Sequence, residues 1–308
     1  EWALSKAPAA RPADTQSWAR GLAAWVSQAR DLPAGQRPVF AEAYELLDEL
    51  GAGGDGMVYR ARRLAASQIV ALKRFASRQH TDQRIQQELR AAELLDHPQL
   101  VCARESGQTA DGERYLVYDM IPAATLQARL RREGRLDVAA VRAIGLGLLE
   151  ALQHVHRAGL VHGDLSPTNV LAQGDTQHWT CWLLDFGLAQ PPGPPLHGSA
   201  GTLRYLSPEQ AAGETIDARA DLYGVACLLY EALAGRSPQV ATSGQRLLYQ
   251  LSTSPAPPVR RFAPQVSDQL AQLLADNLSI DPSSRSPNAL AFAAALQRCS
   301  PGNGLSSP

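Results

Sequence analysis

The chain has 308 residues, of which 45% are hydrophobic and 19% charged, a composition typical of a globular protein with a substantial core. Its 29 basic and 30 acidic residues give a formal net charge of −1, so charge favours neither a nucleic acid nor an anionic membrane as partner. At this length we expect two structural units or one large two-lobed domain.

The cysteines and the apolar runs indicate a cytoplasmic protein. Four cysteines lie far apart without a C-x-x-C pair, which predicts reduced, buried thiols rather than disulfides or a metal site. They are Cys102, Cys181, Cys227 and Cys299. The longest apolar run, at 222–230, is too short to span a bilayer, and no signal-peptide pattern opens the chain, so we expect no membrane segment.

The first residues, 1–40, are expected to form an extension with one amphipathic helix. An Ala- and Pro-rich stretch at 1–13 is expected to be disordered. The helix is predicted over 14–30, because Trp18, Leu22 and Trp25 recur at helical spacing. We interpret this helix as packing onto the domain behind it, in preference to a helix that awaits a partner.

Strand patterns come next and helical patterns follow them. Three short runs at 44–51, 57–63 and 68–75 predict an antiparallel meander. A helix is predicted over 81–96, with Thr81 or Asp82 as its N-cap. The remaining predicted strands lie at 100–106 and 114–119, and the remaining predicted helices at 125–133, 137–158, 217–234, 245–252, 267–277 and 287–298. This order predicts an α+β fold with two lobes.

The first candidate site is the glycine pattern in "LGAGGDGMVY". Gly51, Gly53 and Gly56 match G-x-G-x-x-G, a weak signal alone because glycines also mark ordinary turns. A dinucleotide-binding fingerprint needs a helix after the glycines, whereas here a second strand follows. We therefore interpret the segment as a glycine hairpin whose backbone N–H groups can approach phosphate oxygens.

A lysine at the end of a predicted strand has a candidate acidic partner. Lys73 in "VALKRF" is a possible phosphate-binding cation, although most lysines in this position are only exposed strand ends. Glu88 lies beside the apolar stripe of the predicted helix, so it is expected to face inward, whereas Glu93 points further round. The sequence therefore favours Glu88 as the partner of Lys73.

Two polar segments follow apolar runs in the second half of the chain. "HGDLSPTNVL" contains Asp164 and Asn169, and "LLDFGLA" contains Asp185. Carboxylate and amide oxygens are suitable ligands for Mg²⁺ that bridges phosphates. Acidic groups at such positions are costly to desolvate, and a metal with a substrate hydroxyl would explain them.

Together these segments resemble the eukaryotic-type protein kinase family over about residues 44–296, in the style of its bacterial serine/threonine members. The glycine pattern, "VALK", a helical glutamate, "HGDLSPTN", "DFG" and "SPE" occur in the family's order. The resemblance implies a bilobal kinase-like fold with a small sheet-containing lobe and a larger, mostly helical lobe. The implied boundaries are an extension at 1–40, a small lobe at 41–119, a large lobe at 120–299 and a flexible tail at 300–308.

The same resemblance implies the roles of individual residues, with ATP and Mg²⁺ bound and a protein as substrate. Asp164 would accept the proton of the substrate hydroxyl, Lys73 paired with Glu88 would hold the phosphates, and Asn169 and Asp185 would hold Mg²⁺. The implied ATP contacts are Leu50, Gly51, Gly53, Gly56, Val58, Ala71, Lys73, Asp119, Ile121 and Leu171. Tyr118 would lie behind the base, and His162 would be structural rather than a base.

Two alternatives stay open. Small-molecule kinases also carry H-G-D, but the segment "GSAGTLRYLSPEQ" resembles the protein kinase activation segment that they lack. In that resemblance Glu209 pairs with Arg285, and Asp221 braces the catalytic loop. The second alternative is a pseudokinase-like scaffold that binds nucleotide and transfers poorly, since Ser166 replaces a lysine that usually touches the γ-phosphate.

Another departure from the family pattern concerns regulation. Gly163 replaces the arginine that usually holds a phosphorylated activation loop, and a glycine has no charge to pair with phosphate. We therefore expect activity that does not depend on loop phosphorylation, with Ser199 and Thr202 as the available hydroxyls.

Overall fold

The computed structural model describes residues 39–53, 56–75, 81–175, 178–196, 200–241 and 243–299. These residues form two compact units. Unit 1 contains the described residues up to Leu89 together with Ala103–Pro122, and unit 2 contains Arg90–Cys102 and the described residues from Ala123 onward. The helix predicted at 14–30 and the candidate phosphosite Ser199 lie outside the described residues.

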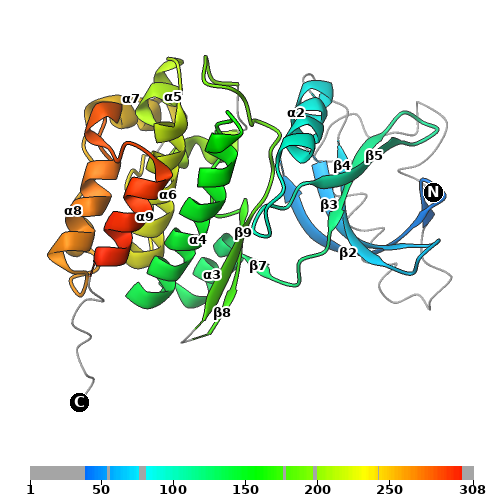
Figure 1. The fold of residues 1–308 in the computed structure, drawn as a ribbon, viewed down its shortest axis with the longest axis horizontal. Helices are drawn as coiled ribbons and strands as arrows, with labels where there is room; N and C mark the ends of the chain where they lie inside the picture. The colour runs from blue at the N-terminus through cyan, green and yellow to red at the C-terminus, as the bar shows by residue number, and fades with distance from the viewer. Residues whose placement is uncertain are drawn as a thin grey trace. The chain divides into compact units, whose positions relative to one another are not determined.

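Unit 1 is built on a six-stranded antiparallel sheet (Figure 1). The strands follow the order β1-β2-β3-β4-β6-β5, so the predicted meander is present and the last two strands exchange places. Their bounds are β1 Val39–Phe40, β2 Tyr44–Gly53, β3 Gly56–Arg63, β4 Ile69–Phe75, β5 Ala103–Gln108 and β6 Arg114–Asp119. The β1 strand was not predicted, because two residues are too few to show a period.

Alternation along the strands gives the sheet two different faces. One face carries a buried apolar cluster that includes Phe40 and Tyr44. Its other members are Leu46, Met57, Tyr59, Ala61, Val70, Leu72 and Val117. The register places Val58 opposite Lys73 and Ala71 opposite Tyr118, so these four side chains share the other face. The predicted site residues of β3 and β4 are thus separated from the apolar cluster by the sheet itself.

Helix α2, Thr81–Leu94, is the predicted helix and ends two residues before its predicted end. Either Thr81 or Asp82 was predicted as the N-cap, but these residues are the first two of the helix itself. Asp82 lies in the first turn, where a negative charge interacts favourably with the helix dipole. The division between the two units falls within this helix, after Leu89.

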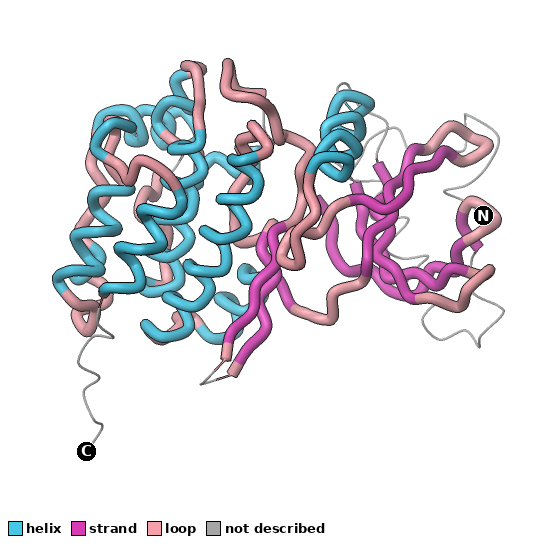
Figure 2. The backbone as a smooth tube through the Cα atoms, viewed as in Figure 1, coloured by secondary structure: helices cyan, strands magenta, loops and turns pink. Residues whose placement is uncertain are grey.

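Unit 2 is mostly helical and includes a small three-stranded sheet (Figure 2). Its helices are α3 Leu126–Glu133, α4 Val138–Arg157, α5 Pro208–Ala212, α6 Ala218–Ala234, α7 Gly244–Thr253, α8 Asp268–Asn277 and α9 Ala289–Arg298. The strands β7 Ala124–Thr125, β8 Val170–Gly174 and β9 Trp179–Leu183 pair in that order. Every predicted helix of this region is present, with ends within one residue of the prediction except that α9 starts two residues later than predicted. Helix α5 and the strands β7 and β8 were not predicted.

The core of unit 2 forms around α4, α6 and α9, which lie side by side (Figure 1). Helix α6 is buried along almost its whole length and on all sides, as expected of a central helix. Helix α4 has 20 residues and is apolar enough, by length and composition alone, to cross a membrane. Its buried residues include Ile144, Leu148 and Leu152 and belong to the core of unit 2, which explains this apolarity.

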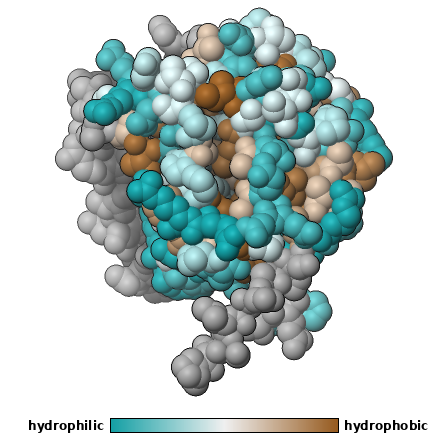
Figure 3. All heavy atoms as spheres, turned by 90° about the vertical axis from the view of Figure 1, so that its left-hand side faces the viewer, coloured by the Kyte–Doolittle hydropathy of each residue, from teal (hydrophilic) through white to brown (hydrophobic). Residues whose placement is uncertain are grey.

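The surface displayed in Figure 3 is mixed in character. Figure 3 shows hydrophilic residues over much of the displayed face, with apolar residues visible as separate areas between them. Such scattered apolar exposure is normal for a protein in water.

Candidate active site

The glycine hairpin of unit 1 joins β2 to β3. Gly51 lies opposite Val58, and Gly53 lies opposite Gly56. Gly56 has φ of +154°, and a Cβ atom built there would lie 1.8 Å from the carbonyl oxygen of Arg74. Glycine at this position is therefore required for the close approach of β4, whatever the hairpin binds.

Lys73 and Glu88 form the predicted ion pair. Lys73 Nζ donates to Glu88 Oε1 at 2.9 Å, and the two side chains are 11% and 1% exposed. Glu93 is exposed, so the sequence-based choice between the two glutamates is confirmed. A buried lysine held by a carboxylate is a cation fixed in one place, which is what binding of phosphate groups requires.

A third group joins this ion pair. The Tyr118 hydroxyl donates to Glu88 Oε2 at 2.6 Å in a buried hydrogen bond. Glu88 therefore receives a hydrogen bond on each carboxylate oxygen, one from β4 and one from β6. Sequence reasoning placed Tyr118 nearby but missed this bond, because it joins residues 30 positions apart.

The predicted ATP contacts of unit 1 lie on strands β2, β3, β4 and β6 and directly after β6. Leu50 is 47% exposed on β2, and Val58 and Ala71 are half-buried on the face that carries Lys73. Asp119 ends β6 and pairs with Arg104 at 2.7 Å. Ile121 follows the strand, and Leu171 is a half-buried residue of β8 in unit 2.

The catalytic-loop candidate in unit 2 is held by His162. The Nε2 atom of His162 faces the carbonyl oxygen of Leu184 at 3.0 Å, and its Nδ1 accepts from the Asp164 N–H at 3.2 Å. This arrangement requires the neutral tautomer that carries its proton on Nε2. Because both ring nitrogens are used, His162 is a structural residue, as the sequence predicted.

Asp164, Asn169 and Asp185 are brought together by the β8–β9 hairpin. Asn169 directly precedes β8 and Asp185 follows β9, and the Leu184 N–H donates to the Asn169 carbonyl at 2.8 Å. Asn169 Nδ2 donates to the Asp164 carbonyl at 2.9 Å and to its carboxylate at 3.1 Å. The two acids therefore lie on adjacent segments of one compact unit.

The oxygen atoms of this group fit a hard cation that also binds phosphate. The amide nitrogen of Asn169 points toward Asp164. The Oδ1 atom of Asn169, which can accept a metal, therefore points away from Asp164. Asp185 adopts a left-handed backbone with φ of +65°, and one of its oxygens accepts from the Gly187 N–H at 3.3 Å. Within the described part of the chain no group of three or more His, Cys, Asp and Glu residues forms a metal cage. A set of one or two protein oxygens completed by phosphates is the environment typical of Mg²⁺.

Asp221 holds the backbone of the catalytic loop, as predicted. Its Oδ1 accepts from the Gly163 N–H and its Oδ2 from the His162 N–H, both at 2.9 Å, and His156 Nε2 lies 2.8 Å from Oδ2. Burial by itself would raise the pKa of Asp221, but the hydrogen bond and electrostatic interaction with His156, together with the backbone hydrogen bond from Gly163, outweigh burial and lower that pKa. Asp221 is thus ionised and holds the backbone of the loop.

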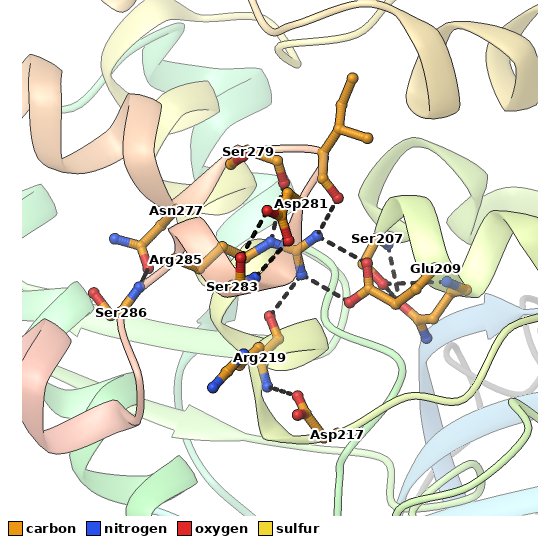
Figure 4. Close-up of polar contacts among 12 residues, drawn as sticks. Ser207, Glu209, Asp217, Arg219, Asn277, Ser279, Asp281, Ser283, Arg285 and Ser286 are labelled. Carbon is orange, nitrogen blue, oxygen red and sulfur yellow. Dashed lines mark hydrogen bonds and ion pairs between the residues drawn. The ribbon is translucent and has the colours of Figure 1, made fainter.

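The end of the activation segment is anchored by Arg285 (Figure 4). Its guanidinium makes two hydrogen bonds to Glu209, at 2.7 and 2.8 Å. Its other donors reach the carbonyl oxygens of Ser279, Arg219 and Ile280. This predicted pair fixes the start of α5, the helix in which Glu209 lies.

Ser166 and Thr168 replace the cation expected in the catalytic loop. The two hydroxyls lie 2.7 Å apart, and Ser166 is 4% exposed. No lysine or arginine occurs in the described stretch 162–171. The loop itself therefore supplies no positive charge.

Comparison with known proteins finds similarity to protein kinases over most of the chain. A family model described as "Protein kinase domain" matches residues 44–296. The chain is similar to "Serine/threonine-protein kinase pkn3" of Myxococcus xanthus, with 34% identity over 272 residues, which is 83% of this chain and 50% of that protein. It is also similar to "Serine/threonine-protein kinase PknD" of Mycobacterium tuberculosis, with 35% identity over 252 residues, 79% of this chain and 37% of that protein. The chain spans half or less of the length of these relatives.

Proposed function

The chain belongs to the protein kinase family, and on that premise we propose that it transfers the γ-phosphoryl group of ATP to serine or threonine hydroxyls of a protein substrate. The observation that carries the proposal is the constrained catalytic loop. Asp164 is held through its backbone by His162 and through its side chain by Asn169. A carboxylate held in this way can accept a proton from a correctly placed hydroxyl group.

The proposed step is a displacement at phosphorus. The substrate oxygen forms a bond to the γ-phosphorus, the bond from that phosphorus to the bridging oxygen breaks, and ADP leaves. Asp164 takes the proton of the hydroxyl group. Little covalent catalysis is available in such a reaction, so positioning and charge do most of the work. Lys73, fixed by Glu88, supplies a positive charge for the phosphates.

Asn169 and Asp185 are the residues proposed to hold Mg²⁺. When bound, Mg²⁺ neutralises negative charge on the phosphates. The all-oxygen character of the set supports this role, as does the orientation of the Asn169 amide. The protein's part is to keep both residues next to Asp164 through the β8–β9 hairpin.

The proposed peptide substrate is supported by the activation segment. Glu209 and Arg285 fix the end of the segment, and binding of a small metabolite does not require this feature. We also propose that the protein works in a reducing, cytoplasmic environment, which the burial of its four widely spaced cysteines supports.

One observation favours a second candidate, a scaffold that binds nucleotide and transfers slowly. The hydrogen-bonded hydroxyls of Ser166 and Thr168 take the place of a cation in the loop. Loss of one donor that stabilises transition-state charge costs about 2.7–4 kcal/mol. The presence of Lys73, Glu88, Asp164, Asn169 and Asp185 favours the kinase over the scaffold.

One assay separates these functions. The purified chain is incubated with Mg²⁺ and ATP labelled on its γ-phosphate, together with a generic protein and a panel of metabolites. We expect label on serine or threonine of the protein. Label on a metabolite would indicate a small-molecule kinase, and nucleotide binding without transfer would indicate a scaffold. Asp164→Asn should keep nucleotide binding and lose transfer, and Asp185→Asn should lose the Mg²⁺-dependent part of binding.

A further inference from the structure

Gln210 links the end of the activation segment to the catalytic loop. Its Oε1 atom accepts from the Ser207 N–H at 3.0 Å and from the Ser207 hydroxyl at 3.1 Å, which closes the capping box of α5. Its Nε2 atom donates to the carbonyl oxygen of Gly163 at 2.8 Å. One amide side chain therefore contacts the helix cap with its oxygen and the catalytic loop with its nitrogen.

The carbonyl that Gln210 binds belongs to the peptide group just before Asp164. The N–H of that peptide, carried by Asp164, donates to His162 Nδ1. The preceding N–H, carried by Gly163, donates to Asp221 Oδ1. Together with the bond from Asn169 Nδ2 to the Asp164 carbonyl, these hydrogen bonds hold the backbone that carries the catalytic carboxylate. Among them, the bond from Gln210 comes from the activation segment.

The geometry at Gly163 explains why this link uses the backbone. Gly163 has φ of +75°, a left-handed conformation that disfavours other residues. A Cβ atom there would lie 3.4 Å from the Leu188 carbonyl oxygen and 4.0 Å from Gln210 Nε2. Gly163 carries no charge, and its carbonyl receives a neutral donor. A link of this kind requires no phosphate group.

Gln210 is also rigidly held at its own end. Ser207, Pro208 and Glu209 are buried, and Glu209 is fixed by both terminal nitrogens of Arg285. The start of α5 cannot shift without breaking this buried ion pair. A displacement of the Gly163 carbonyl would therefore break its hydrogen bond to Gln210 instead of carrying the helix with it.

We propose that Gln210 is a positioning residue for Asp164. It couples the peptide-binding end of the activation segment to the catalytic carboxylate through a neutral hydrogen bond, and this coupling operates without phosphorylation of the loop. The inference rests on the proposed kinase function, because its consequence is the rate of phosphoryl transfer.

Two substitutions of Gln210 test the link. Gln210→Glu keeps the oxygen that closes the capping box, since glutamate is a standard residue at that position, but it removes the donor to Gly163. Gln210→Met is similar in length, is neutral, and cannot donate. Gln272→Glu is the matched control. Gln272 Nε2 donates to Asp276 Oδ1 at 2.7 Å on the exposed face of α8, so this substitution makes the same chemical change away from the catalytic loop.

We expect both Gln210 variants to lower kcat about tenfold. This value lies near the upper end of the roughly 2–12-fold equivalent of one neutral hydrogen bond, and below the roughly 100-fold cost of a 1 Å misplacement at a reacting group. The KM for ATP should change less than kcat, and Gln210→Glu should keep a melting temperature close to that of the Gln272→Glu control. Phosphatase treatment of the unmodified protein should leave most of its rate.

A second measurement does not depend on activity. Amide hydrogen exchange in the peptide around residues 160–166 should become faster in both Gln210 variants and stay unchanged in Gln272→Glu. Unchanged rate and unchanged exchange in Gln210→Met would overturn the proposal, even if Gln210→Glu were slow, because a charge effect would then explain the latter. If the unmodified protein transfers no phosphate, the proposed function fails, and the exchange comparison still decides whether the link holds the loop.

Discussion

Replacing Arg285 by methionine should destabilise unit 2 more than most single substitutions. The side chain of Arg285 is fully buried, and each of its five N–H groups has an acceptor. Two of these bonds go to Glu209, whose side chain is 6% exposed. Arg285→Met leaves that carboxylate buried without its cation and leaves three carbonyl groups without their donor.

The magnitude follows from this environment. Breaking a buried ion pair by removing one partner costs about 3–5 kcal/mol, because the other charge stays uncompensated. In a unit of this size each kcal/mol lowers the melting temperature by about 2–4 °C, so a decrease of roughly 6–20 °C is expected. The melting temperature of Arg285→Lys should lie between those of the unmodified protein and Arg285→Met, because lysine keeps the charge but cannot bind the carboxylate with two parallel bonds.

A double-mutant cycle in thermal or urea unfolding tests the reasoning. Replacing both residues, as Arg285→Met with Glu209→Met, removes the unpaired charge, and buried pairs replaced by apolar side chains are often close to neutral. The double variant should therefore be more stable than Arg285→Met alone. If the two single losses simply add, the residues are not coupled and the assignment of the pair as a unit is wrong.

Three further predictions concern the site. Lys73→Met and Glu88→Ala should each lower phosphoryl transfer by orders of magnitude in the labelled-ATP assay, whereas Glu93→Ala, an exposed residue of the same helix, should leave transfer unchanged. Tyr118→Phe removes a hydrogen bond to a charged group, worth about 1.5–3 kcal/mol, and should lower kcat/KM for ATP; an unchanged value would show that the hydroxyl does not help to hold Glu88. The pKa of Asp221 is lower in the folded protein than in the unfolded chain, so the ionised carboxylate stabilises the fold. This stabilisation is fully present above the ordinary pKa of Asp and is lost as pH falls through the lowered pKa. Asp221→Asn should therefore flatten the acid limb of a curve of stability against pH.

The sequence by itself determined the family, the order of the elements and most helix boundaries. Helix starts were predictable to within a residue or two because a single side chain signals them: Asp137 caps α4 by accepting from the Ala140 N–H, and Ser267 caps α8 by accepting from the Leu270 N–H. The inward position of Glu88 followed from the apolar stripe beside it. These signals are local, so a short stretch of sequence contains them completely.

The tertiary structure alone decided which distant groups meet wherever the family resemblance indicated no pair. The exchange of β5 and β6, the hydrogen bond from Tyr118 to Glu88 and the link from Gln210 to Gly163 each join residues that no local period relates. The tautomer of His162 also depends on Leu184, which lies on another segment. Hydrogen bonds act over about 3 Å in space and carry no trace in sequence spacing, so these contacts became visible only when packing brought their partners together.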